Sequence, residues 1–216
     1  MKKRLIIALL AGATLLPALQ GCFPVVAAGI AGSVLAGTDR RTLGTQTEDE
    51  TLEWKTSNRL REKFSERSHI NVTSYNRKVL LSGEVPSPEM KAEAERIAAS
   101  QPNVRGVFNE LTTGNVTSYS NRSNDAFITS KVKARFIDAA RFSPNHVKVV
   151  TEARTVFLLG LLTQREAQAA IDLARTTRDV AKVVSLVEII SDGQARELDP
   201  PRPDPSLQSD PDASRG

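Results

Sequence analysis

Two stretches of the chain carry the same succession of apolar patterns. Each begins with apolar or small positions that recur every four residues, a spacing that predicts a helix with one buried stripe. The stripes are Leu52, Thr56, Leu60 and Phe64 in the first stretch and Ile128, Val132 and Phe136 in the second. Asn124 and Asp125 precede the second stripe and offer an N-cap for that helix.

A hairpin, a second helix and a last strand are predicted after each stripe. Apolar runs over 70–73 and 79–81 flank a polar turn, and the second stretch repeats this around residues 152–155. Gly83 and Gly160 end the hairpins, where we expect a positive φ or a close backbone approach. The stripes of the second helices are Met90, Ala94 and Ile97, and Ala167, Ala170, Ile171 and Ala174. Final strands are expected over 104–111 and 180–190.

These stretches form an internal repeat of about 70 residues. Four blocks recur in one order: 58–64 with 130–136, 69–72 with 146–149, 79–83 with 156–160, and 104–109 with 180–185. The predicted class is therefore α+β, with two tandem α-β-β-α-β modules. In each module two helices pack on one face of a three-stranded mixed sheet.

The N-terminus is typical of an exported lipoprotein. Met1-Lys2-Lys3-Arg4 is a positive segment, and the apolar run from Leu5 to Leu19 is short for a transmembrane helix. Leu19-Gln20-Gly21-Cys22 resembles a bacterial lipobox, which predicts a signal peptide over 1–21 and lipid attachment at Cys22. Cys22 is the one cysteine of the chain, so it has no internal disulfide partner. Phe23, in place of an aspartate, favours the outer membrane.

The remaining boundaries follow from composition. Residues 22–50 are assigned to the lipidated cysteine and a linker, 51–113 and 124–191 to the two modules, and 114–123 to a second linker. Residues 192–216 are expected to form a disordered proline-rich tail, because residues 199–216 hold five of the eleven prolines and few apolar side chains.

Charge and site chemistry argue against several classes of function. The 29 Lys and Arg against 25 Asp and Glu leave a net charge of +4, too small to indicate a nucleic-acid-binding face. No nucleophile elbow, phosphate loop or cysteine cluster occurs. His69 and His146 stand at equivalent places in the repeat, which favours a structural role for both. We therefore expect no enzyme, cofactor, metal site or small-molecule substrate.

The motifs resemble the BON domain, a bacterial α-β-β-α-β module with a hairpin ending in Gly and a final Val-x-x-Val-x-Asn strand. Two copies after a lipobox are similar to the dual-BON outer-membrane lipoproteins of Gram-negative bacteria, over roughly residues 19 to 191. The specific stretches are 19–22, 44–47 before 51–53, 70–73 and 160–167. The resemblance implies binding of anionic phospholipid, enrichment at the division site and support of outer-membrane integrity. It also implies lipid contact on the first helix of the second module, where Phe127 holds the place of a Trp found in close relatives.

The residues of this helix point to the same surface. At 100° per residue, Phe127 lies about 140° from the centre of the stripe of Ile128, Val132 and Phe136. Lys131 and Arg135 follow four and eight residues later, and Lys133 lies on the flank. A large apolar group beside several cations suits an anionic bilayer, to which each nearby basic residue adds about 1 kcal/mol.

Other interpretations remain open at this point. Phe127 can instead cap the core or contact the other module, with the basic residues forming a solvated face. Trp54 also lies off its stripe, and we expect it to pack between the modules. A competing function is a periplasmic adaptor that docks envelope-assembly or peptidoglycan-remodelling proteins, with Phe127 as a hot spot.

Overall fold

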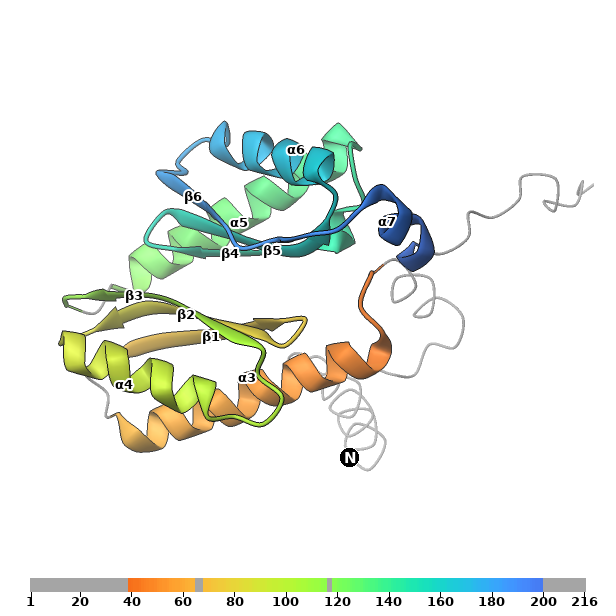
Figure 1. Ribbon diagram of the computed structural model, residues 1–216. Helices are drawn as coiled ribbons and strands as arrows, with labels where there is room; N and C mark the ends of the chain where they lie inside the picture. Colours follow the sequence, from red (N-terminus) through yellow and green to blue (C-terminus); the bar gives the residue numbers. More distant parts are fainter. Residues whose placement is uncertain (1–38, 65–67, 116–117, 200–216) are drawn as a thin grey trace, which may run out of the picture. The chain divides into compact units, whose positions relative to one another are not determined.

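A computed structural model of the chain describes residues 39–64, 68–115 and 118–199 (Figure 1). These described residues belong to one compact unit. The first module contains, in order, α3 (Leu43–Lys63), β1 (His69–Tyr75), β2 (Lys78–Val85), α4 (Pro88–Ala99) and β3 (Gly106–Thr113). The second contains α5 (Tyr119–Ala139), a 3-10 turn η2 (Pro144–His146), β4 (Val147–Glu152), β5 (Thr155–Leu162), α6 (Gln164–Arg175), β6 (Lys182–Ser185) and β7 (Glu188–Ile189). A further helix, α7 (Asp192–Leu198), follows.

Both sheets are mixed, and both are built around the second strand of the hairpin. β2 pairs antiparallel with β1 and parallel with β3, and β5 pairs in the same two ways with β4 and β6. β7 continues the parallel pairing along β5 in the register of β6, so the strand expected over 180–190 is present but interrupted. The predicted α+β class and the α-β-β-α-β order are confirmed.

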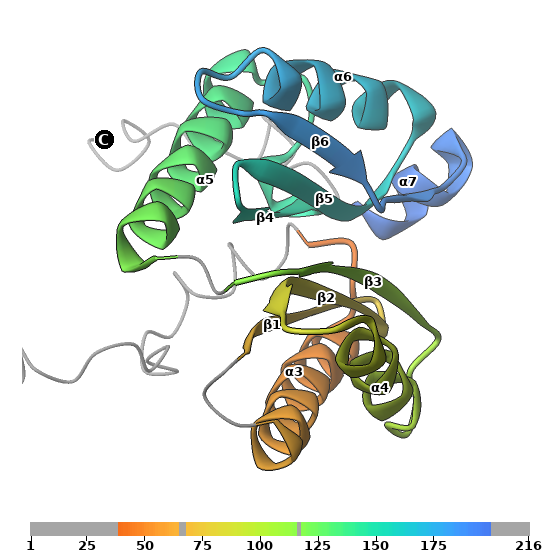
Figure 2. The ribbon, with the colours of Figure 1, turned by 90° about the vertical axis from the view of Figure 1, so that its left-hand side faces the viewer.

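The two helices of each module cover one face of its sheet (Figure 2). In the second module Ile128, Val132 and Phe136 are fully buried against β4, β5 and the small residues of α6. In the first, Leu60 packs with the apolar residues of β2 and with Ala94 and Ala98 of α4. The small alanines let each second helix approach the sheet closely. In α4, Ala98 is buried beside the predicted Ala94, while the predicted Met90 and Ile97 are only partly buried.

The uncovered faces of the two sheets supply a third apolar cluster. Its buried members are Tyr75 and Leu80 from the first module and Phe157, Leu159 and Leu161 from the second. Burial raises the pKa of the Tyr75 hydroxyl. Apolar side chains therefore alternate onto both faces of β5, which explains the continuous run that the sequence shows there.

Both first helices begin earlier than the stripes indicate. α3 begins at Leu43, within the predicted linker 22–50, and α5 begins at Tyr119, within the predicted linker 114–123. The caps are Thr42 and Ser118, whose side chains accept hydrogen bonds from the backbone N–H of Thr45 and Asn121. The prediction of an N-cap at Asn124 and Asp125 was wrong, because an earlier serine already satisfies the helix terminus.

Asp125 has a different role, which Asp49 repeats in the first module. Asp125 accepts hydrogen bonds from the backbone N–H of Ala153 and Arg154, the two turn residues of the β4–β5 hairpin. Asp49 accepts from Asn76 and Arg77 in the β1–β2 turn. All four turn residues have positive φ, as a two-residue turn with the strands' right-handed twist requires.

This shared contact corrects the helix alignment of the repeat. Asp49 corresponds to Asp125, so Leu60 corresponds to Phe136. The earlier pairing of 58–64 with 130–136 was wrong by one helical turn, because four-residue periodicity fits equally well after a shift of four. Phe64 lies at the C-cap of α3 and is only partly buried.

Gly83 and Gly160 lie within β2 and β5, not at the ends of the hairpins. A Cβ at Gly83 would stand 2.0 Å from the carbonyl oxygen of His69, and one at Gly160 would stand 2.4 Å from that of His146. Gly83 also has a φ of +116°. The expected close backbone approach is therefore confirmed at both positions, and the positive φ at Gly83.

The boundary predicted for the disordered tail, residue 192, was wrong, because ordered structure continues beyond it. Ser191 and Gln194 form a reciprocal capping box that starts α7, and Ala195 of that helix is buried. The carboxylate of Asp199 accepts from the buried guanidinium of Arg40, at 2.7 Å. The prolines that indicated disorder begin only at residue 200, and residues 200–216 lie outside the described part of the chain.

Candidate functional site

Phe127 lies on the outer side of α5, away from the core. Its side chain is 61% exposed, while Ile128, Val132 and Phe136 on the opposite side of the helix are buried. The ammonium of Lys131 lies 4.7 Å from the centre of the Phe127 ring, within the range of a cation–π contact. The structure thus confirms that Phe127 points away from the core. The alternative in which it caps the core is wrong.

Lys131 is only partly available to a ligand. Its ammonium forms an ion pair with the carboxylate of Asp179, which follows α6. The hydrogen bond from Lys131 lowers the pKa of Asp179, and the neighbouring positive charges add to this effect. Lys131 therefore joins α5 to the loop after α6, and its positive charge is largely balanced within the module.

Arg135 has a structural role that its spacing does not reveal. Its Nη1 donates hydrogen bonds to the carbonyl oxygen of Leu173 and to the hydroxyls of Thr176 and Thr177. These groups lie at the C-terminal end of α6, where a cation also interacts favourably with the helix dipole. Reversing the charge of Arg135 would therefore disturb the packing of α5 on α6 as well as any surface contact.

Lys133 is the exposed cation of the predicted set. Within the described residues it has neither a hydrogen bond nor an ion pair. Its flank of α5 also carries an apolar residue that the sequence analysis missed. Ile137 is 63% exposed, and the exposed Ala134 lies between it and Phe127 along the helix. The angular spacing of 127, 134 and 137 could have revealed this second apolar strip, but Ile137 follows core Phe136 and was overlooked.

Trp54 of α3 is the exposed aromatic on the first helix of the first module, at a position that Ser130 holds in α5. Its side chain is 65% exposed, so the expectation that it packs between the modules was wrong. Glu53 beside it does contact the second module, through a hydrogen bond of 2.6 Å from the ammonium of Lys148. Glu53 therefore lies on the side of α3 that contacts the second module, whereas the neighbouring Trp54 points to solvent.

The predicted lipid-attachment site lies before the first described residue, Asp39. Cys22 and the predicted signal peptide lie outside the described residues. No helix in the described ranges is both long and apolar enough to cross a membrane.

Comparison with known proteins assigns the family. The BON domain model matches residues 48–115 and 124–191, one match for each module. The chain belongs to the BON domain family. The second match has the predicted bounds, and the first extends the predicted 51–113 by a few residues at either end.

Named relatives share most of the chain. It is 38% identical to "Outer membrane lipoprotein DolP" of Haemophilus influenzae, over 85% of this chain and 95% of that protein. It is 35% identical to "21 kDa hemolysin" of Actinobacillus pleuropneumoniae, over 70% of this chain and 79% of that protein. Neither name is that of an enzyme family. A solved structure of CdsD, a structural protein of the type III secretion system of Chlamydia trachomatis, matches with 10% identity over 71% of this chain and all of that one, and its TM-score of 0.28 is too low to support a conclusion.

Proposed function

We propose that this chain is a non-enzymatic outer-membrane lipoprotein that binds anionic phospholipid through α5 of its second module. The observation that carries the proposal is the exposed Phe127 ring, with Lys131 over it, on a helix that also exposes Lys133 and whose other side is buried. An aromatic ring gains free energy by entering the acyl boundary, and basic side chains gain by lying near anionic headgroups.

The exposed residues of α5 differ in whether they have partners within the module. Phe127 and Ile137 supply apolar groups, and Lys133 supplies a cation with no partner among the described residues. Lys131 and Arg135 are held by the loop after α6 and by the end of α6. We therefore assign insertion to Phe127 and most of the salt-dependent attraction to Lys133, while Lys131 and Arg135 fix the helix on its module.

The location rests on the N-terminus and on a relative. The lipobox predicts that Cys22 is acylated, and several acyl chains make anchoring effectively permanent. The relative of Haemophilus influenzae is named as an outer-membrane lipoprotein, which supports the same compartment for this chain. In that arrangement the modules face the periplasm, and support of membrane integrity, including at the division site, would follow from lipid binding.

Vesicle binding tests the proposal. A soluble form that starts at Thr38 lacks the lipid anchor, so any sedimentation with vesicles reports on the modules alone. We expect binding to vesicles that contain phosphatidylglycerol and none to pure phosphatidylcholine. Lys133→Gln should weaken binding roughly fivefold, corresponding to about 1 kcal/mol, and should reduce its sensitivity to salt.

The adaptor hypothesis gives a different outcome in the same experiment. A protein-docking surface around Phe127 would leave the soluble form in the supernatant with both kinds of vesicle. Equal binding to both would contradict the anionic preference. A Cys22→Ala chain that still incorporates labelled palmitate would contradict the predicted lipid attachment.

A further inference from the structure

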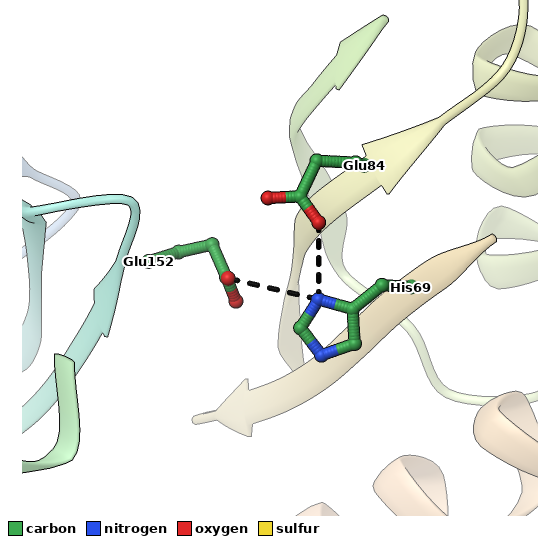
Figure 3. A group of neighbouring side chains, drawn as sticks. All are labelled: His69, Glu84 and Glu152. Carbon is green, nitrogen blue, oxygen red and sulfur yellow. Dashed lines mark hydrogen bonds and ion pairs between the residues drawn. The ribbon is translucent and has the colours of Figure 1, made fainter. Parts of the chain in front are cut away.

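Two carboxylates and an imidazole converge where the first module meets the hairpin of the second. His69 begins β1, Glu84 stands directly opposite it on β2, and Glu152 ends β4 (Figure 3). The Nδ1 atom of His69 lies 3.2 Å from Oε2 of Glu84 and 3.7 Å from Oε1 of Glu152. One potential ligand atom from each residue lies within 4.8 Å of the other two.

These distances match the spacing of ligands around a transition-metal ion. Zinc binds nitrogen and carboxylate oxygen at about 2.0–2.2 Å, so neighbouring ligands of a tetrahedral site lie about 3.4 Å apart. The two measured separations fall within a few tenths of an ångström of that value. An imidazole with two carboxylates selects such an ion over Mg²⁺ or Ca²⁺, which prefer oxygen ligands alone.

The site is also enclosed and supported. The side chains of His69, Glu84 and Glu152 are 15%, 7% and 8% exposed. The amide of Asn71 donates to the second oxygen of Glu152 at 2.6 Å and lies 3.4 Å from Nε2 of His69. Asn71 therefore orients Glu152 from outside, as the outer partners of metal ligands do.

Comparison with the other module shows that the carboxylates are not part of the repeated framework. Glu84 and Leu161 are equivalent, because each directly follows the strand glycine of its module, Gly83 or Gly160. Glu152 and Tyr75 are equivalent, because each is the last residue before the hairpin turn. At the equivalent position around His146, the side chains are therefore apolar and aromatic. Burying two carboxylates instead costs free energy unless a cation is present.

We propose that His69, Glu84 and Glu152 bind one divalent transition-metal ion of the zinc class, which joins the two modules. Two ligands come from β1 and β2 of the first module and the third from β4 of the second. This function is independent of lipid binding, because α5 supplies none of the ligands. The equivalence of His69 and His146 suggested a structural role for both from the sequence. No sequence spacing could bring Glu152, 83 residues away, to His69.

Equilibrium dialysis of the full-length chain in detergent against micromolar Zn²⁺ tests the site, with bound metal measured by elemental analysis. We expect one Zn²⁺ ion bound per chain through these three residues, and we expect it to remain bound in excess Mg²⁺ and Ca²⁺. His69→Ala, Glu84→Gln and Glu152→Gln should each lose it, and Asn71→Ala should weaken it roughly 10–100-fold. Glu53→Gln is the matched control, because Glu53 also joins the modules but lies outside the cluster, and it should retain the ion. Co²⁺ should give a visible absorption band in the wild type that is absent from Glu152→Gln.

Thermal unfolding separates loss of metal from loss of folding. With EDTA present, Glu152→Gln should melt no lower than the wild type, since it removes a buried charge at constant shape. Added Zn²⁺ should raise the midpoint of the wild type and of Glu53→Gln, but not that of Glu152→Gln. Wild-type protein that retains no Zn²⁺, or equal binding by the wild type and all three ligand variants, would overturn the proposal.

Discussion

The first and second modules share their backbone contacts and differ in the side chains added to them. In both, an aspartate of the first helix holds the hairpin turn, and a glycine lets the second strand approach the carbonyl oxygen of a histidine. Yet Tyr75 of the first module corresponds to Glu152 of the second. The exposed aromatics also differ in position, because Trp54 of α3 and Phe127 of α5 are not equivalent in the repeat. The repeated contacts therefore maintain the fold, and the candidate functional residues other than His69 lie where the copies have diverged.

The largest expected effect is at the two glycines. Replacing Gly83 or Gly160 with Val places a branched side chain against a backbone carbonyl oxygen. The cost should be about 2–6 kcal/mol, from overpacking and backbone strain. Gly83→Val should cost more than Gly160→Val, because its Cβ would come closer to the oxygen and its φ is positive. Urea unfolding of the soluble form measures both, and equal or negligible losses would contradict the assigned geometry.

The aspartates should show a smaller difference between the modules. Asp49 accepts from Ser74 and Arg41 as well as from the two turn N–H groups, whereas Asp125, within the described part of the chain, accepts from the turn alone. Asp49→Asn should therefore cost about 2–4 kcal/mol and Asp125→Asn about 1–2 kcal/mol, since hydrogen bonds to charged groups are the stronger ones. Asp172→Asn, a change on the exposed face of α6, should cost almost nothing. Similar losses at all three positions would mean that the turn contacts contribute little.

Apolar periodicity was sufficient to predict the repeat, the element order and the buried side of each first helix. It could not locate the beginnings of those helices, because the first turns of α3 and α5 are polar and carry no stripe. It placed Phe127 correctly, since exposure follows from angle alone. It could not separate Lys133 from Lys131 and Arg135. The partners of Lys131 and Arg135 are Asp179, Leu173 and Thr176, which lie 38 to 48 residues further along the chain.

Phe127 and Trp54 offer a matched pair for the membrane-contact proposal. They are similarly exposed, at 61% and 65%, but lie on different modules. Phe127→Ala should lower affinity for anionic vesicles roughly ten- to hundredfold, because burying such a ring contributes about 1.5–3 kcal/mol. Trp54→Ala should leave the affinity nearly unchanged, and neither variant should lose thermal stability. Equal effects on binding would show that the membrane contact is not confined to α5.

The smallest effect concerns the second helices, whose N-termini also differ between the modules. Thr163 and Glu166 form a reciprocal capping box at α6, whereas at α4 Ser87 caps alone because Met90 stands at the third position. Glu166 also accepts two hydrogen bonds from the buried guanidinium of Arg40. Burial alone would raise the pKa of Glu166, but the hydrogen bonds from Arg40 and Thr163 outweigh it, so the pKa lies below its ordinary value.

A carboxylate with a lowered pKa stabilises the folded state while it is ionised. That stabilisation is complete above the ordinary glutamate pKa and is lost as the pH falls through the lower, folded-state value. Glu166→Gln should therefore reduce the free energy of unfolding by about 1 kcal/mol at pH 7, and the gap from the wild type should close on acidification below the ordinary pKa. Glu89→Gln in the first turn of α4 is the comparison. A hydrogen bond with Ser87 also lowers the pKa of Glu89, but this side chain is fully exposed and lacks an arginine partner among the described residues, so its gap should be much smaller. A gap that stays constant down to strongly acidic pH would show that Glu166 acts through its shape and not through its charge.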